Sequence, residues 1–251
     1  MRVIFSKDRP AQLDLLLRSI ERNMEPEDTT IIVHASTPMF VKGYGKIKNP
    51  AWVFREGHFD WHLRDSLRVA DETVTFFCDD DIVYRPVPRQ PSELLLSDEM
   101  ILAVCLYLGN GNTQMGLPRG FPVWRWQPLP RHDFGFPTAI DGNTYRTQDV
   151  LALIGDEVIP NPTMLETVMA LRAERIAGER SLMAAFEQQS LVGVPVNRVS
   201  DQSGVPFGNI FPQSVEELND RFLAGQRIDL DALDFSGITS CHHEIRFVWA
   251  S

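Results

Sequence analysis

A short apolar run that ends in three consecutive aspartates constrains this chain more than any other feature. Residues 74–78 are apolar apart from Thr75, and Asp79, Asp80 and Asp81 follow them directly. A short apolar run bounded by polar residues predicts a buried strand. Carboxylates at the end of such a strand repel one another unless a cation lies between them. Oxygen ligands on one short loop suit Mg²⁺ or Mn²⁺, and an acidic surface turn is the alternative.

Length and charge narrow the class of protein. A chain of 251 residues with 43% hydrophobic and 23% charged residues is typical of one large globular α/β domain, or of a domain with a modest appendage. The formal net charge of −10 argues against a nucleic-acid partner, because a phosphate backbone needs a basic surface. An anionic small ligand would require a metal or locally placed Arg and Lys.

The cysteine content, the charged residues near the N-terminus and the short apolar runs predict a cytoplasmic protein. Cys78, Cys105 and Cys241 are odd in number and show no C-x-x-C spacing, which favours a reducing compartment and no structural zinc. We expect no secretory leader, because charged residues follow Phe5 almost at once. We expect no transmembrane segment either, since the longest apolar run, 100–108, is far shorter than the ~20 residues that a spanning helix needs.

Strands and helices alternate in the first third of the chain. The sequence predicts strands at 2–5, 30–34, 52–55 and 73–78, and helices from Ala11 and from Asp60. This alternation predicts an α/β fold with a mostly parallel central sheet flanked by helices, with ligands at the carboxyl ends of the strands. The polar loop from Ser6 to Arg9 precedes a helix there, which suits a phosphate or nucleotide. A helix capped by Asp8 or Ser6 is the alternative.

The rest of the chain predicts further strands and helices. We expect strands at 101–107, 123–127 and 191–199, and helices at 147–154, 163–177, 181–189 and 215–223. Trp124 and Trp126 could stack on a sugar or belong to the core. Thr163 and Glu166 have the spacing of a capping box, which is a structural role for Glu166.

The C-terminal segment from Cys241 onward reads as a strand. On a strand His242 shares one face with polar residues, and His243 shares the other with Ile245 and Phe247. The alternation favours His242 as a metal ligand and His243 as a core histidine.

The order of these features resembles that of GT-A-fold glycosyltransferases, which use nucleotide-sugar donors. Residues 76–81 resemble the D-x-D motif, residues 142–157 are similar to the strand, loop and helix before the catalytic region, and Cys241-His242 resembles the C-terminal metal ligand. Met164-Leu165-Glu166 lies where the family carries an acidic motif with the general base. The usual Glu-Asp pair is absent, so Asp141 and Asp133 remain alternative bases.

The resemblance implies one glycosyltransferase-like domain, with a nucleotide-binding half at 1–86 and an acceptor and catalytic half at 87–251. It implies Mn²⁺ or Mg²⁺ as cofactor, a UDP- or GDP-sugar donor, and a glycan or other hydroxyl as acceptor. The implied donor-binding residues are Ser6, Lys7, Arg9, Ser36, Arg64, Asp79 and Asp80; the metal ligands are Asp79, Asp81 and His242; the catalytic residues are Glu166 and Asp141.

Two other classes of protein remain open from the sequence. A metal-dependent nucleotidyltransferase or phosphohydrolase could use the same acids, although the chain lacks both D-x-D-G-T near its N-terminus and a Gly-rich loop with Lys after the first strand. A non-catalytic relative that binds a nucleotide-sugar is the third interpretation.

Overall fold

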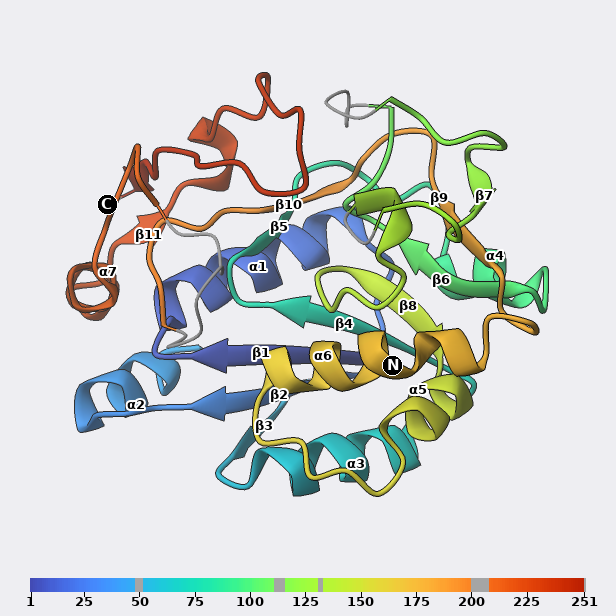
Figure 1. The fold of residues 1–251 in the computed structure, drawn as a ribbon. Helices are drawn as coiled ribbons and strands as arrows, with labels where there is room; N and C mark the ends of the chain where they lie inside the picture. Colours follow the sequence, from blue (N-terminus) through green and yellow to red (C-terminus); the bar gives the residue numbers. More distant parts are fainter. Residues whose placement is uncertain (48–51, 111–115, 131–132, 200–207, 251) are drawn as a thin grey trace.

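The computed structural model describes residues 1–47, 52–110, 116–130, 133–199 and 208–250. Its centre is an eight-stranded sheet in the order β3-β2-β1-β4-β8-β6-β9-β7 (Figure 1). The strands are β1 (Arg2–Lys7), β2 (Thr29–His34), β3 (Trp52–Glu56), β4 (Thr73–Cys78), β6 (Ile101–Cys105), β7 (Val123–Arg125), β8 (Asn143–Arg146) and β9 (Leu182–Ala185).

The sheet is mostly parallel. β3, β2, β1 and β4 are parallel neighbours, and so are β6 and β9. β8 lies between β4 and β6 and is antiparallel to both, and β7 is antiparallel to β9. This arrangement, with helices on both faces, confirms the predicted α/β class.

Helices cover both faces because successive strand residues point in opposite directions. Ile4 and Phe77 pack into one core layer, which includes α1 (Pro10–Asn23). Val3 and Phe76 pack into the other layer, under α3 (Phe59–Val69), α5 (Thr147–Ile154) and α6 (Pro162–Arg172). The remaining helices are α2 (Pro38–Tyr44), α4 (Pro91–Leu96) and α7 (Val215–Leu223), with short 3₁₀ turns at Asp133–Gly135, Ala173–Arg175 and Leu230–Ala232.

Two small sheets stand beside the large one. β5 (Asp81–Val83) pairs antiparallel with β10 (Leu191–Gly193), and β11 (Arg227–Ile228) pairs with β12 (Trp249–Ala250). The first of these sheets carries Asp81, so it connects the aspartates to the second half of the chain.

Several predictions in the second half of the chain were wrong. The helix expected at 181–189 is the strand β9, because its apolar residues complete the central sheet beside β6. The strand expected at 191–199 ends at Gly193, and within the segment expected to be the final strand only β12 is a strand. Trp124 and Trp126 are buried and donate to the carbonyls of Phe134 (2.7 Å) and Arg180 (2.8 Å), so they belong to the core.

The alternative interpretation, in which Asp8 or Ser6 caps the first helix, was also wrong. Arg9 occupies the N-cap position of α1, and no side-chain hydrogen bond caps it. Asp8 has a left-handed backbone, with φ of 56°, and its Oδ1 accepts a hydrogen bond from the Ser36 backbone N–H at 2.7 Å. Asp8 therefore joins the loops after β1 and β2 instead of capping the helix. Within the described residues, no helix has the length and apolar character that crossing a membrane requires.

Candidate active site

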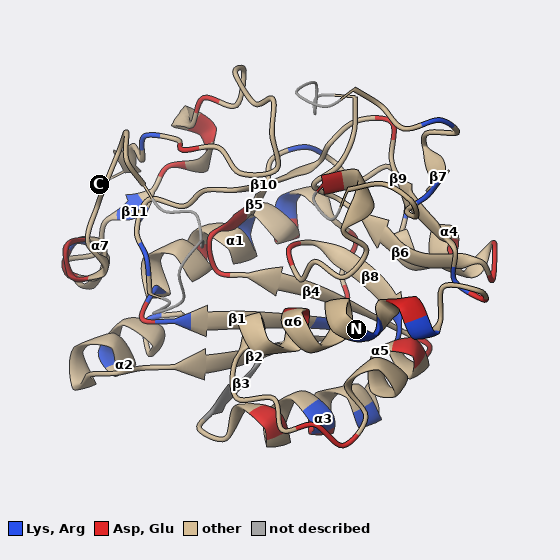
Figure 2. Ribbon diagram, in the orientation of Figure 1, with Lys and Arg blue, Asp and Glu red and all other residues tan. Residues whose placement is uncertain are grey.

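The three aspartates lie at the carboxyl end of β4, beside the end of β1. Figure 2 shows the acidic turn after β4 next to the basic tip of β1. The chain turns there directly into β5, so Asp81 is already paired with Gly193 of β10. The three consecutive carboxylates consequently have three different environments.

Asp79 is held by groups of the protein itself. Its Oδ2 accepts hydrogen bonds from Ser6 Oγ and from the Lys7 backbone N–H, both at 2.9 Å. Its Oδ1 accepts from Arg9 Nη1 at 2.9 Å. Burial raises the pKa of Asp79 to about 6, while Arg9 opposes the shift. Because both of its oxygens already have donors, Asp79 suits an anchoring role better than the metal role inferred from the sequence.

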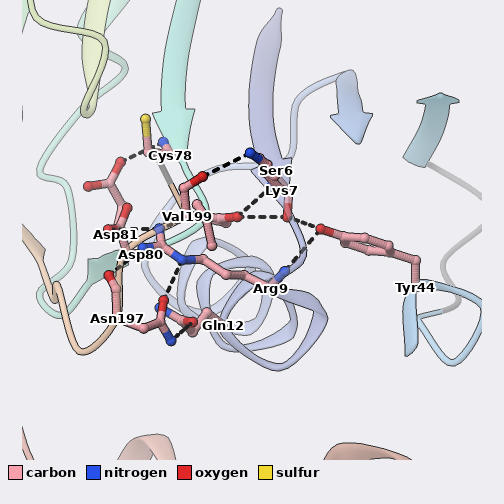
Figure 3. Close-up of polar contacts among 11 residues, drawn as sticks. Ser6, Lys7, Arg9, Gln12, Tyr44, Cys78, Asp80, Asp81, Asn197 and Val199 are labelled. Carbon is pink, nitrogen blue, oxygen red and sulfur yellow. Dashed lines mark hydrogen bonds and ion pairs between the residues drawn. The ribbon is translucent and has the colours of Figure 1, made fainter. Parts of the chain in front are cut away.

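Arg9 is the centre of a buried polar network (Figure 3). Its Nη1 also contacts Asp80 Oδ2 at 3.0 Å. Its Nε and Nη2 donate to the side-chain and backbone oxygens of Asn197, both at 2.6 Å. Asn197 in turn donates to Gln12 at 3.0 Å. The guanidinium therefore connects the acidic turn with the segment after β10.

Asp81 is a carboxylate with one oxygen that is free to bind a ligand. It is buried, and its Oδ2 accepts a hydrogen bond from the Cys78 backbone N–H at 2.9 Å. Its Oδ1 has no hydrogen-bond partner among the described residues. Burial, followed by the charges of Asp141 and Asp80, raises the pKa of Asp81 well above its ordinary value. An unpaired buried carboxylate is unfavourable, and a cation bound at Oδ1 would remove that cost.

Asp141 lies close enough to Asp81 to act on its charge, and His242 lies beside Asp141. His242 Nε2 is 3.9 Å from Asp141 Oδ2, and the Cys78 thiol hydrogen bonds with the same carboxylate. Burial raises the pKa of Asp141, and His242 opposes the shift. Asp141 precedes Gly142, whose φ of 71° turns the chain into β8. The turn at residues 141–143 thus places a carboxylate beside the aspartates.

Glu166 faces this group of acids instead of capping its helix. α6 begins at Pro162, and its cap is Asn161, whose side chain accepts from the Met164 N–H at 2.9 Å. The capping-box interpretation of Glu166 was therefore wrong. Its carboxyl is engaged by the Ile140 backbone N–H, and burial and then Asp141 raise its pKa from 4.5 to about 8.

The other residues predicted for the site lie around it or away from it. Lys7 Nζ donates to the Val199 carbonyl at 2.9 Å, and Ser36 is exposed at the end of β2. Asp133 Oδ1 accepts from the Cys241 thiol at 3.3 Å. Arg64 on α3 donates to the Gly155 carbonyl at 2.8 Å and pairs with Asp60 on its own helix. It therefore connects α3 with the end of α5 and does not contact the three aspartates after β4.

Neither histidine stands on a regular strand. His242 is connected by an isolated bridge to Gly193 and reaches Asp141, whereas His243 is half-buried near Asp234 and Glu244 and is not a core histidine. Sequence reasoning missed Asn197, Tyr44 and Gly193. Tyr44 shares a hydrogen bond of 2.7 Å with Ser6 Oγ from the end of a helix that was not predicted. No spacing in the sequence connects these three residues with the aspartates.

The donor set fits a divalent cation in its chemistry. Asp81 supplies an unpartnered buried oxygen and Asp141 a second carboxylate, which are ligand types that suit Mn²⁺ and Mg²⁺. His242 adds an imidazole, which favours Mn²⁺ over Mg²⁺. Among the described residues, no group of three or more His, Cys, Asp or Glu side chains is placed so that it could hold a metal ion as it stands. The remaining positions would belong to a substrate and water, as is usual for Mg²⁺.

The sequence matches no protein-family model and no curated protein. In structure the chain is similar to residues 1–349 of TarS from S. aureus, with 13% identity, a TM-score of 0.44, and coverage of 76% of this chain and 59% of that one. It is similar to a mannosyltransferase from Pyrobaculum calidifontis solved with GDP-Man and Mn²⁺, with 14% identity, a TM-score of 0.40, and coverage of 74% and 55%.

A third similar structure is the 4-diphosphocytidyl-2C-methyl-D-erythritol synthase from Anaerococcus prevotii, with 9% identity, a TM-score of 0.35, and coverage of 74% and 86%. The chain thus spans less than two thirds of the length of the first two proteins. These values describe a distant likeness of fold, and the activity has to be inferred from the residues of this chain.

Proposed function

We propose that this chain is a divalent-metal-dependent glycosyltransferase that moves a sugar from a UDP- or GDP-sugar to an acceptor hydroxyl. The observation that carries the proposal is the grouping of Asp81, Asp141, His242 and Glu166 at the carboxyl end of β4. Asp81 and Asp141 come from neighbouring positions of the sheet, and the other two come from segments far away in the sequence. Such grouping of acids with raised pKa values is typical of catalytic sites.

In this proposal Asp81, Asp141 and His242 hold Mn²⁺ or Mg²⁺. The ion would supply Lewis-acid stabilisation of the charge that develops on the departing nucleoside diphosphate. Asp79 does not bind the ion; it fixes the acidic turn through Ser6, Lys7 and Arg9. This assignment revises the metal ligands inferred from the sequence by replacing Asp79 with Asp141.

Glu166 is the proposed general base. Its carboxylate would accept the proton of the acceptor hydroxyl as that oxygen attacks the sugar carbon, and such a group contributes typically ~10²–10⁴-fold to the rate. The raised pKa, about 8, makes the ionised carboxylate a stronger base than an exposed glutamate. Asp141 lies beside Glu166 and acts on it electrostatically, so we assign Asp141 to the cation and Glu166 to the proton.

The nucleotide is proposed to lie at the ends of β1 and β2, in the half formed by residues 1–86. Ser6, Lys7 and Ser36 lie at that edge, and the exposed Ser36 leaves it open to a ligand. Residues 87–251 contribute Asp141, Glu166 and His242, so this half would receive the acceptor. Arg9 and Arg64 are not part of the proposed nucleotide contacts, because Arg9 is buried in its own network and Arg64 contacts Gly155 and Asp60.

Incubation with Mn²⁺ and a panel of UDP-, GDP- and CMP-sugars tests the proposal. A transferase should slowly hydrolyse its donor when no acceptor is present, releasing the free sugar and a nucleoside diphosphate (or CMP from a CMP-sugar). Hydrolysis should stop with EDTA and in Asp81→Asn. In a second incubation with a nucleoside triphosphate and a sugar phosphate, formation of a nucleotide-sugar with release of pyrophosphate would identify a nucleotidyltransferase. Tight binding of a nucleotide-sugar without turnover would identify a non-catalytic relative.

A further inference from the structure

Gly193 stands between two residues of the proposed metal set. As the last residue of β10 it pairs directly with Asp81 of β5 on one side. On its other side it forms an isolated bridge with His242. The Gly193 N–H donates to the Cys241 carbonyl at 3.0 Å, and its carbonyl accepts from the His243 N–H at 2.9 Å. The bridge therefore fixes the backbone of His242 relative to Asp81.

The imidazole of His242 occupies the space that a side chain at position 193 would take. A Cβ built on Gly193 would lie 2.6 Å from His242 Cδ2 and 3.2 Å from His242 Nε2. Directly opposed residues on paired strands project to the same face, so Asp81 projects on the side of this missing Cβ. The ring thus packs against the backbone of Gly193, and its Nε2 lies 3.9 Å from Asp141 Oδ2.

We propose that Gly193 is a positioning residue for His242: the absence of its side chain lets the imidazole lie over β10, within reach of Asp141 and on the side of Asp81. The inference rests on the proposed role of His242 in holding the cation. Any side chain at position 193 pushes the ring outward, because no real Cβ tolerates a contact of 2.6 Å.

The requirement for glycine is local to this contact. The three atoms nearest to the added Cβ all belong to His242. The backbone of Gly193 is not in the left-handed region that only glycine adopts readily, so alanine causes no backbone strain. The side chain of His242 is 42% exposed, which allows the ring to swing outward. Gly193→Ala should therefore fold and should displace one imidazole.

A double-mutant cycle tests the proposal through metal binding. Mn²⁺ is titrated calorimetrically into wild type, Gly193→Ala, His242→Ala and the double variant, with Gly178→Ala as control because a Cβ there meets no atom within 4 Å. Loss of groups that orient a metal ligand typically weakens metal affinity ~10–100-fold. We expect Gly193→Ala to weaken Mn²⁺ binding about as much as His242→Ala, and the double variant to equal His242→Ala. Independent, multiplying losses would overturn the proposal.

The stability of the metal-free proteins gives a second readout. Any loss of unfolding free energy in Gly193→Ala should disappear in the His242→Ala background, where the added methyl group meets no ring. A loss that persists without the imidazole would contradict the inference, even if Gly193→Ala proved too unstable for titration.

Failure of the proposed function would give a different result in the Mn²⁺ titrations. If His242→Ala binds Mn²⁺ like wild type, His242 holds no cation and the inference falls with it. If only Gly193→Ala binds like wild type, the role of Gly193 alone is wrong.

Discussion

Replacing Glu166 by glutamine should make the metal-free protein more stable and the enzyme much slower. Glutamine keeps the shape of the side chain and can still accept a hydrogen bond from the Ile140 N–H. It cannot ionise, so it removes both the cost of a buried charge and the proposed base. The change therefore separates the functional role of the carboxylate from a structural one.

The stability gain follows from the pKa of Glu166, which burial and Asp141 raise from 4.5 to about 8. Because the unfolded chain ionises first, this group contributes most to stability below pH 4.5, and the contribution is lost as the pH rises to about 8. At ~1.4 kcal/mol per pH unit the cost at neutral pH is ~3 kcal/mol. The side chain is partly exposed, so solvent screening reduces the expected gain to ~1–2 kcal/mol.

Urea unfolding in EDTA at several pH values measures this gain. Glu166→Gln should be more stable than wild type at neutral pH, and the difference should shrink toward pH 4.5. Donor hydrolysis or transfer should fall by ~10²-fold or more in the same variant. A variant that is less stable at every pH and turns over normally would refute the reasoning, because Glu166 would then be a structural residue.

Three further predictions concern neighbouring groups. The kcat/KM of wild type should rise with pH as Glu166 ionises and should level off below about 8, because the cation offsets the charge of Asp141 that helps to raise the pKa of Glu166; Glu166→Gln should lack this rise. Arg9→Met should lower the unfolding free energy by ~3–5 kcal/mol in urea denaturation, since it leaves Asp79 and Asp80 without their buried cation; an unchanged midpoint would contradict the network. His243→Ala should keep the Mn²⁺ affinity that His242→Ala loses, and the opposite order in calorimetry would reverse the assignment.

The sheet and the position of the aspartates could be predicted because local sequence patterns determine them. An apolar run that ends in polar residues gives a strand end, and parallel strand ends lie at one edge of the sheet. The predictions for residues 2–5 and 73–78 follow this logic and agree with β1 and β4, and the helix predicted at 147–154 agrees with α5. The helix expected at 181–189 failed because burial beside β6, and not helical periodicity, decides the structure of β9.

The details of the site depend on contacts between distant segments, which no local pattern reports. Asp79 looks equivalent to Asp81 in the sequence, but only Asp79 meets Arg9 and Ser6. Glu166 has the spacing of a capping box, yet Asn161 caps the helix and turns Glu166 to the acids. The side chain of His242 reaches Asp141 without the regular strand that the alternation required, because a single bridge to Gly193 fixes its backbone.

The central claim is that the acids after β4 bind a nucleoside diphosphate through a divalent cation. Calorimetric titration of UDP and GDP into the protein, with Mn²⁺ and then with EDTA, tests it most directly. Wild type should bind one of the two nucleotides at least ~10-fold more tightly with Mn²⁺. Asp81→Asn, which removes the carboxylate with the unpartnered Oδ1, should bind equally weakly in both conditions. Equal affinity of wild type with Mn²⁺ and with EDTA would contradict the account.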